Sequence, residues 1–143
     1  MIKLKEITQD VSYTAVVLTR KSHNILVELM KEYIPDNWKL YAHHTTITMG
    51  PYQGNKELIG KEFDITVNSY MVDDKVMAVG VYMPIETKNK HPHITIAVNI
   101  QGDGKPFLSN KLDWDNAIKL PNTKLTGKLI EVPRGDNRFA DEY

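Results

Sequence analysis

Three absences limit what this chain can be, and the first of them is cysteine. Without any thiol among its 143 residues, the chain can form neither disulfide bonds nor thiolate metal sites, and the redox compartment stays open. An excess of charge is the second absence, because Lys plus Arg and Asp plus Glu both number 18. A net charge of zero argues against a protein that depends on general attraction to long nucleic acid, while it leaves room for a local basic pocket.

Long apolar segments are the third absence. No run approaches the roughly 20 apolar residues that span a membrane, and Met1–Glu6 lacks the apolar core of a signal peptide. We therefore expect a cytoplasmic protein that has no membrane partner. The apolar fraction of 41% and the charged fraction of 25% are ordinary for a globular protein. The length predicts one domain over residues 1–143, with a loose polar tail from about 134.

A four-residue motif, His-x-Thr-Ile, is present twice, at residues 44–47 and 93–96. In a β-strand, alternate side chains share a face. The first strand then presents His44, Thr46 and Thr48 on one face and Thr45, Ile47 and Met49 on the other. The second presents His91, His93, Thr95 and Ala97 on one face and Ile94, Ile96 and Val98 on the other. Each strand can therefore join an apolar core and still show a histidine and a threonine to a groove.

The first copy of the motif overlaps a second possible His-x-Thr motif, because His43 and Thr45 have the same spacing as His44 and Thr46. With His43 and Thr45 facing the groove, Ile47 would face it too. The register of His44 and Thr46 gives a polar groove face and a mostly apolar core face, so we choose it. His43 is then expected to be a packed or surface histidine whose ring points away from the groove.

The pattern along the rest of the chain predicts an α+β fold with a mixed or antiparallel sheet and helices on the outside. A helix is expected over 23–34 with Ser22 as its N-cap and His23 exposed, and a second, short helix is expected over 110–119. The expected strands are 11–19, 38–49, 63–72, 75–83, 91–100 and 125–132, with a hairpin turn at Asp73-Asp74.

Two imidazoles that face each other across a small groove suit acid–base chemistry. One neutral ring takes a proton from water or a hydroxyl, and the other, protonated, gives one to a leaving oxygen. Two threonine hydroxyls beside them can hold the non-bridging oxygens of a phosphate. That scheme requires no metal or other cofactor. The competing interpretation is a metal site at which His44, His91 and His93 converge, but neither motif contains a carboxylate.

Two His-x-Thr-hydrophobic words on separate strands resemble the signature of the 2H phosphoesterases, the LigT-like family. The resemblance implies a two-lobed α+β domain with a central groove, and metal-independent hydrolysis of phosphodiesters in nucleotides and RNA ends. It assigns the catalytic roles to His44 and Thr46 in one motif and to His93 and Thr95 in the other.

Within that family, the residues around the motifs most resemble the phage anti-CBASS nucleases, which degrade cyclic oligonucleotide immune signals. The residues that carry this resemblance are 42–47, 91–99 and 104–110. It implies a cyclic di- or trinucleotide substrate and, if a phage encodes the protein, a location in the host cytoplasm. Tyr13, Lys105 and Ser109 are the expected substrate-binding residues, since an aromatic ring can stack a base and a loop cation or hydroxyl can contact phosphate. Five other aromatic residues could also stack a base: Trp38, Tyr41, Tyr52, Tyr70 and Tyr82.

Two alternatives stay open at this point. One is a 2′,3′-cyclic phosphodiesterase that acts on RNA ends in repair or processing. The other belongs to a different class, a module that sequesters nucleotides without cleaving them, although a pure binding module has no need of two positioned imidazoles. Arg134 and Arg138 are read as charges of the polar tail, and the sequence does not define the oligomeric state.

Overall fold

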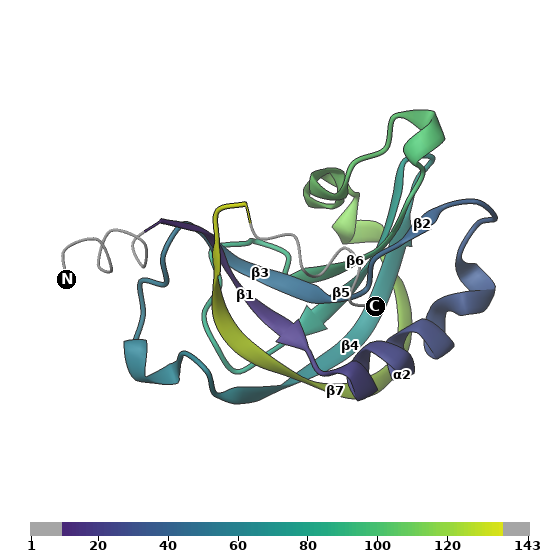
Figure 1. The fold of residues 1–143 in the computed structure, drawn as a ribbon. Coiled ribbons are helices and arrows are strands. Elements are labelled where there is room, and N and C mark those ends of the chain that lie inside the picture. Colours follow the sequence, from purple (N-terminus) through teal and green to yellow (C-terminus); the bar gives the residue numbers. More distant parts are fainter. Residues whose placement is uncertain (1–9, 136–143) are drawn as a thin grey trace.

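The computed structural model describes residues 10–135 and is dominated by β-strands (Figure 1). The strands are β1 (Val11–Leu18), β2 (Lys39–Leu40), β3 (His44–Met49), β4 (Glu62–Val72), β5 (Val76–Tyr82), β6 (His93–Val98) and β7 (Ile118–Pro133). The one α-helix in this part of the chain is α2 (Arg20–Met30). Five 3₁₀ turns are distributed along the chain: η1 (Lys31–Tyr33), η2 (Lys56–Leu58), η3 (Ile100–Gly102), η4 (Pro106–Lys111) and η5 (Trp114–Asn116). No helix within 10–135 is long and apolar enough to cross a membrane.

The strands form one antiparallel, seven-stranded sheet in the order β2-β6-β5-β4-β7-β1-β3. The expected hairpin between residues 63–72 and 75–83 is confirmed as the β4–β5 pair. The antiparallel sheet with the helix α2 packed on it is compatible with the predicted α+β class. The two-lobed arrangement implied by the family resemblance stays a prediction, because all seven strands belong to a single curled sheet.

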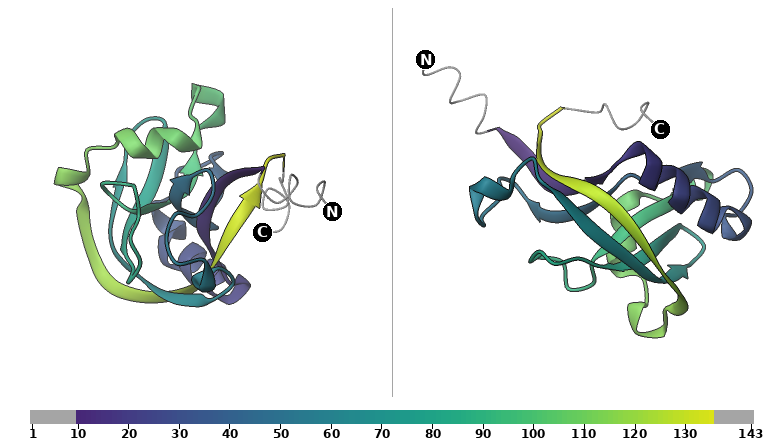
Figure 2. Two further views of the ribbon diagram at one scale, coloured as in Figure 1. Left: turned by 90° about the vertical axis from the view of Figure 1, so that its left-hand side faces the viewer. Right: turned by 90° about the horizontal axis from the view of Figure 1, so that it is seen from below.

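The long strand β7 joins the two halves of this sheet. Its first part pairs with β4, from Ile118 opposite Tyr70 to Lys128 opposite Glu62, and its last part pairs with β1. It curves beneath the molecule in Figure 1 and around its edge in the left view of Figure 2. Only residues 125–132 had a clear strand pattern, because the side chains over 118–124 are exposed or half-buried. Pairing with β4, rather than burial, makes those residues a strand.

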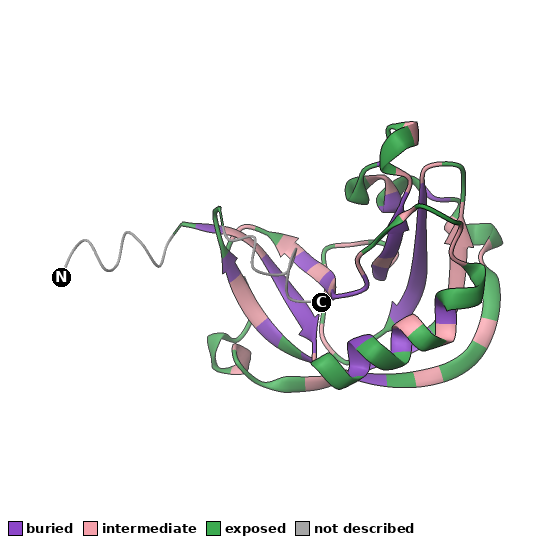
Figure 3. Ribbon diagram, turned by 45° about the vertical axis from the view of Figure 1, so that its right-hand side comes forward, coloured by how far each residue is buried: buried purple, intermediate pink, exposed green. Residues whose placement is uncertain are grey.

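One face of the curled sheet carries the main apolar core. Buried side chains from β1 and β3 to β7 meet there and are joined by Leu26 and Met30 of α2. Bands of buried and exposed residues alternate along α2 in Figure 3, as an amphipathic helix requires. Two smaller clusters lie apart from this core, one around Ala15, Val17 and Val132, the other around Val76, Ala78, Val98 and Leu112.

The helix α2 begins three residues earlier than its sequence pattern indicated. Thr19 is the N-cap, and its Oγ1 accepts a hydrogen bond of 3.1 Å from the amide of Ser22. The predicted cap Ser22 has a different role, because its hydroxyl accepts a 2.8 Å bond from the amide of Thr126 on β7. His23 was predicted to be exposed, but it is buried, and its Nδ1 lies 2.7 Å from the carbonyl oxygen of Ala42.

A short crossing segment, residues 41–43, brings the two ends of the sheet together. The amides of Tyr41 and Ala42 donate to the carbonyls of Ile96 and Thr95 on β6, and the carbonyl of His43 accepts from Leu18 of β1. Ala42 turns the chain between these partners with a φ of 61°. A left-handed conformation is uncommon outside glycine, and the buried site of Ala42 holds it in place. The expected continuous strand over 38–49 is therefore broken into β2 and β3.

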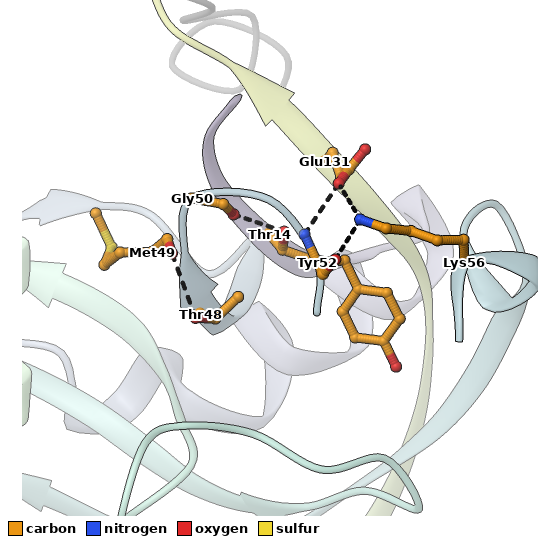
Figure 4. A network of polar contacts seen from close by, with 7 residues as sticks. All are labelled: Thr14, Thr48, Met49, Gly50, Tyr52, Lys56 and Glu131. Carbon is orange, nitrogen blue, oxygen red and sulfur yellow. Dashed lines mark hydrogen bonds and ion pairs between the residues drawn. The ribbon is translucent and has the colours of Figure 1, made fainter. Parts of the chain in front are cut away.

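The far end of β3 is anchored by the polar network in Figure 4. The hydroxyl of Thr14 donates to the carbonyl of Gly50 at 2.9 Å, and the amide of Tyr52 donates to a carboxylate oxygen of Glu131 at the same distance. Lys56 donates to the Tyr52 carbonyl and lies 3.5 Å from the same Glu131 oxygen. These contacts tie the segment after β3 to β1 and β7, so they fix where β3 ends.

Two further predictions were wrong. The helix expected over 110–119 is absent, because η4, η5 and the start of β7 occupy that range. Pro106 is the first residue of η4, and both η4 and η5 are 3₁₀ rather than α-helical. Arg134 is not a loose tail charge either, since its Nε donates to Asp10 at 2.8 Å and its amide donates to the Asp10 carbonyl. Arg138 lies outside the described residues.

Candidate functional site

The two motif strands β3 and β6 contact each other and line one pocket of about 510 Å³, called here the motif pocket. Its lining residues are Tyr13, Tyr41, His43, His44, Thr46, Thr48, Met49, Lys88, Asn89, His93, Thr95, Pro106, Phe107 and Asn110. His44, Thr46, His93 and Thr95 are therefore brought together, although the two histidines are 49 positions apart in the chain. Tyr13 reaches the same pocket from β1.

The motif strands share a local irregularity. In β3, Thr46 pairs with Ala15 and Thr48 pairs with Thr14, so Ile47 is an extra residue. In β6, Thr95 pairs with Ala78 and Ala97 pairs with Met77, so Ile96 is extra. Each motif is thus followed directly by a β-bulge, a feature that re-aims side chains next to many active sites.

The alternation predicted for the start of each motif is confirmed. Thr46 lines the pocket, whereas Thr45 and Ile47 are buried in the protein. Beyond the bulges the predicted faces are wrong for Met49 and Ala97, since the extra residue disturbs the alternation, whereas Thr48 lines the pocket as predicted. Met49 was expected in the core but is 72% exposed and lines the pocket. Ala97 was expected on the groove face but belongs to the main core.

His44 lies against the ring of Tyr13, with 5.3 Å between the ring centroids. Burial lowers the pKa of His44 to about 3, and repulsion from a positive charge on His43 or His93 adds to the effect. The ring is therefore neutral near pH 7 in the absence of substrate. A phosphate in the pocket would counter this, because negative charge favours the protonated imidazole.

His93 is held on two sides. Its Nδ1 lies 2.7 Å from the carbonyl oxygen of His91, and the Trp114 ring stacks on it with 5.6 Å between centroids. Gly80 pairs with His93 on one side and with Ser69 of β4 on the other, and a Cβ at Gly80 would clash with the Ser69 hydroxyl. Burial lowers the pKa of His93, and the hydrogen bond to His91 acts in the opposite direction.

The two threonines are held differently. The Thr95 hydroxyl lies 2.8 Å from the hydroxyl of Ser109 and 3.4 Å from the carbonyl of Pro106. Thr46 is held through its backbone, because its carbonyl accepts a 2.9 Å bond from the side-chain amide of Asn89 and a longer one from Thr87. The loop between β5 and β6 therefore supports the bulge of β3.

Ser109 is fully buried behind Thr95, so it contacts a motif residue rather than the pocket itself. The Thr95 hydroxyl donates a long 3.4 Å bond to the Pro106 carbonyl, so if Ser109 donates to Thr95, a ligand in the pocket competes only with Pro106 for the Thr95 proton. Lys105 is exposed and is not among the residues that line the pocket. Among the other aromatic residues considered, Tyr41 lines the pocket, whereas Tyr52 is buried elsewhere and Tyr82 is 64% exposed.

We expect Ser109→Ala to lower kcat by roughly threefold to tenfold, which corresponds to the loss of one neutral hydrogen bond that orients the Thr95 hydroxyl. Steady-state kinetics of the folded variant test this. Ser69→Ala is the matched control, because the Ser69 hydroxyl bonds to Asn68 outside the motif pocket. A rise in KM alone would contradict the orienting role of Ser109.

The sequence interpretation missed five residues that line the pocket: Lys88, Asn89, Pro106, Phe107 and Asn110. They lie on loops just before β6 and just after it, where no periodic pattern marks them. Their short distance along the chain from the second motif was the available signal. Lys88 is the one lysine or arginine among the lining residues, so it supplies the positive charge of the pocket.

His43 was expected to point away from the groove, and this is wrong. It is 8% exposed, lines the motif pocket, and its Nδ1 lies 2.6 Å from Nδ1 of His44. The two rings stack at 18° with 4.7 Å between centroids. The physical reason is the left-handed turn at Ala42, because it places His43 before the start of β3 and outside its alternation.

The competing metal interpretation finds no support within the described part of the chain. Residues 10–135 contain no group of three or more His, Asp or Glu side chains placed to hold a metal ion. His91, the third ligand proposed for that site, is half-buried and precedes β6. It contributes its carbonyl oxygen to His93 instead.

Comparison with known proteins gives one family. No curated protein matches the chain. The model of the fungal tRNA ligase phosphodiesterase domain matches residues 18–127, which include both motifs and more than half of the chain. The chain therefore belongs to the fungal tRNA ligase phosphodiesterase domain family, a 2H phosphoesterase family, and is a phosphodiesterase of the hydrolase class.

Proposed function

We propose that this phosphodiesterase opens 2′,3′-cyclic phosphates at RNA ends, with His44, Thr46, His93 and Thr95 as its catalytic residues. One observation carries the proposal: two His-x-Thr pairs from distant strands line a single pocket. The family description adds the substrate class, since a tRNA ligase acts on RNA ends and its phosphodiesterase domain matches both motifs.

The hydrogen bonds around His93 support an assignment of acid and base. A carbonyl oxygen can only accept, so the His93 Nδ1 donates to His91 and the neutral ring has its lone pair on Nε2. His93 is then the base that takes a proton from water as the water oxygen attacks phosphorus. The bond from phosphorus to one ribose oxygen breaks, and His44 gives that oxygen a proton.

The threonines provide the second part of the mechanism. Their hydroxyls lie on the same strand faces as the histidines and donate to the non-bridging oxygens of the phosphate, where negative charge grows in the transition state. Thr95 is oriented by Ser109, and Thr46 by the loop that carries Asn89. The product is a phosphate monoester, and no step requires a metal ion.

A longer RNA end has a second place to bind, because a side pocket of about 160 Å³ lies next to the motif pocket. The two pockets share Thr48 and Lys88. The side pocket is further lined by Ile47, Tyr52, Gln53, Gly54, Glu86 and Thr87. An ammonium group at the junction suits the phosphate that links the terminal nucleotide to the one before it. This arrangement favours a polynucleotide end over a free mononucleotide.

The second candidate substrate is a cyclic di- or trinucleotide, as the resemblance to phage anti-CBASS nucleases implies. Aromatic side chains on both sides of the pocket favour it: Tyr13 beside β3, and Phe107 on η4, which follows β6. Each ring can stack one base of a compact ligand. The family match does not include this substrate class, so we place it second.

A substrate panel in excess EDTA tests the proposal. It contains an oligoribonucleotide with a 2′,3′-cyclic phosphate, a 2′,3′-cyclic mononucleotide, and cyclic di- and trinucleotides. We expect turnover of the oligoribonucleotide at a kcat/KM on the order of tenfold above the mononucleotide, since one added phosphate contact to a cation contributes about 1.5 kcal/mol. Product analysis identifies the bond that breaks.

Two outcomes would overturn parts of this proposal. Preferential cleavage of the cyclic oligonucleotides would replace the RNA-end assignment with the second candidate. Loss of turnover on chelation, with recovery after a divalent ion is added, would overturn the metal-independent mechanism.

A further inference from the structure

The contact between His43 and His44 is closer than their stacking requires. Their Nδ1 atoms are 2.6 Å apart, which is a hydrogen-bond distance and not a van der Waals contact. The family signature contains one histidine per motif, and in the second motif the corresponding Nδ1 meets a backbone carbonyl instead. The first motif thus has an ionisable partner where the second has a fixed acceptor.

We propose that His43 is a positioning residue that shares one proton with His44, so that the two adjacent imidazoles act together as the acid of the reaction. This inference rests on the proposed function, because it concerns the group that protonates the leaving oxygen. It adds a residue outside the two His-x-Thr words to the machinery of the site.

The hydrogen-bond requirements of the two rings support this role. A neutral imidazole has one N–H, so an Nδ1-to-Nδ1 bond needs one ring to donate and the other to accept. With one added proton, both rings have an Nε2–H and a single hydrogen lies between the two Nδ1 atoms. In that state every ring nitrogen is protonated or hydrogen-bonded, and the Nε2–H of His44 is available to the pocket.

After the pair gives up one proton, both of its imidazole rings are neutral and neither becomes an imidazolate anion. The His44 Nε2–H bond breaks as an O–H bond forms on the leaving ribose oxygen, and the shared hydrogen settles on Nδ1 of His44. His43 keeps its Nε2–H and accepts from His44, so both rings end neutral. At this point His93 holds the proton taken from water. The site is restored when His93 releases that proton to solvent and the His43–His44 pair takes up one proton.

The surroundings keep the two rings in contact. His43 is 8% exposed and follows the buried turn at Ala42, whose carbonyl is bound by the His23 ring. The titratable or charged groups that face the pair come from several elements: His23 of α2, Tyr41 of the crossing segment, Tyr13 of β1, His93 of β6 and Lys88 of the β5–β6 loop. No carboxylate is among these described groups, and the Nδ1 of His43 lies within hydrogen-bond distance of the His44 Nδ1 and can accept its proton.

The test compares His43→Leu with His43→Asn in the full chain. Leucine fills the space without a polar atom, whereas asparagine can place an amide oxygen near the position of Nδ1. We expect His43→Leu to move the basic limb of the kcat/KM profile about one pH unit lower and to reduce kcat/KM at neutral pH on the order of tenfold, as loss of one hydrogen bond to a charged group predicts. His43→Asn should restore the limb to within a few tenths of a unit.

A merely structural His43 would lower kcat/KM in both variants without moving the limb, and this result would overturn the inference. Thermal unfolding checks that each variant is folded. ¹⁵N NMR of the histidine rings tests the same point without substrate, because one shared proton must shift the His43 and His44 signals together as the pH falls. Independent titration of the two rings would also overturn it. The NMR result stands even if the substrate panel shows no turnover, so failure of the proposed function and failure of this inference are distinguishable.

Discussion

Replacement of either motif histidine by alanine is expected to lower kcat by a factor of about 10² to 10⁴, which is the contribution typical of one positioned acid or base. The reason is that His44 and His93 line the same pocket and no other ring in the second motif can take the place of His93. The double variant His44→Ala with His93→Ala should cost far less than the product of the two single losses, since the residues act as one unit. Single-turnover kinetics of the three folded variants measure this.

The pH dependence of the native enzyme gives a second view of the pair. A base that must be neutral and an acid that must be protonated produce a bell-shaped profile of kcat/KM. Burial lowers the pKa of His93 and lowers that of His44 to about 3, so both limbs should lie below the ordinary histidine value and the maximum on the acid side of neutrality. Bound phosphate favours the protonated rings, so the kcat profile should be shifted to higher pH. A profile without an acidic limb would contradict the general-base role of His93.

Deletion of the threonine hydroxyls is expected to have the next largest effect. Thr46→Val and Thr95→Val keep the side-chain shape and should each lower kcat by about 10² to 10³, because each removes one donor to an oxygen whose charge grows in the transition state. KM should change little. The matched control is Thr123→Val on β7, whose hydroxyl bonds to Pro121 away from the motif pocket.

The alternative outcome for the threonines has a clear signature. A rise in KM with kcat unchanged would show that a hydroxyl only binds substrate. The two variants should also differ in one respect. Thr95 shares its hydroxyl with Ser109, so Thr95→Val leaves a buried serine without its partner and should lower thermal stability more than Thr46→Val.

The two motif strands show where the sequence pattern predicts the structure and where it does not. Alternation placed His44, Thr46, His93 and Thr95 on the exposed faces, because a period of two is a local property of any strand with one apolar side. The same local rule failed for Met49 and Ala97. A bulge adds one residue to one strand of a pair, and no residue type at Ile47 or Ile96 announces it.

The α+β class, the β4–β5 hairpin and both motifs were determined by the sequence alone, because each depends on residues close together in the chain. Tertiary structure decided how these parts meet. The curl of the sheet brings β3 against β6, and the left-handed turn at Ala42 places His43 against His44. The exposed first half of β7 is a strand only because β4 pairs with it. Such contacts join residues far apart in the chain or depend on a single backbone angle, and neither leaves a periodic pattern in the sequence.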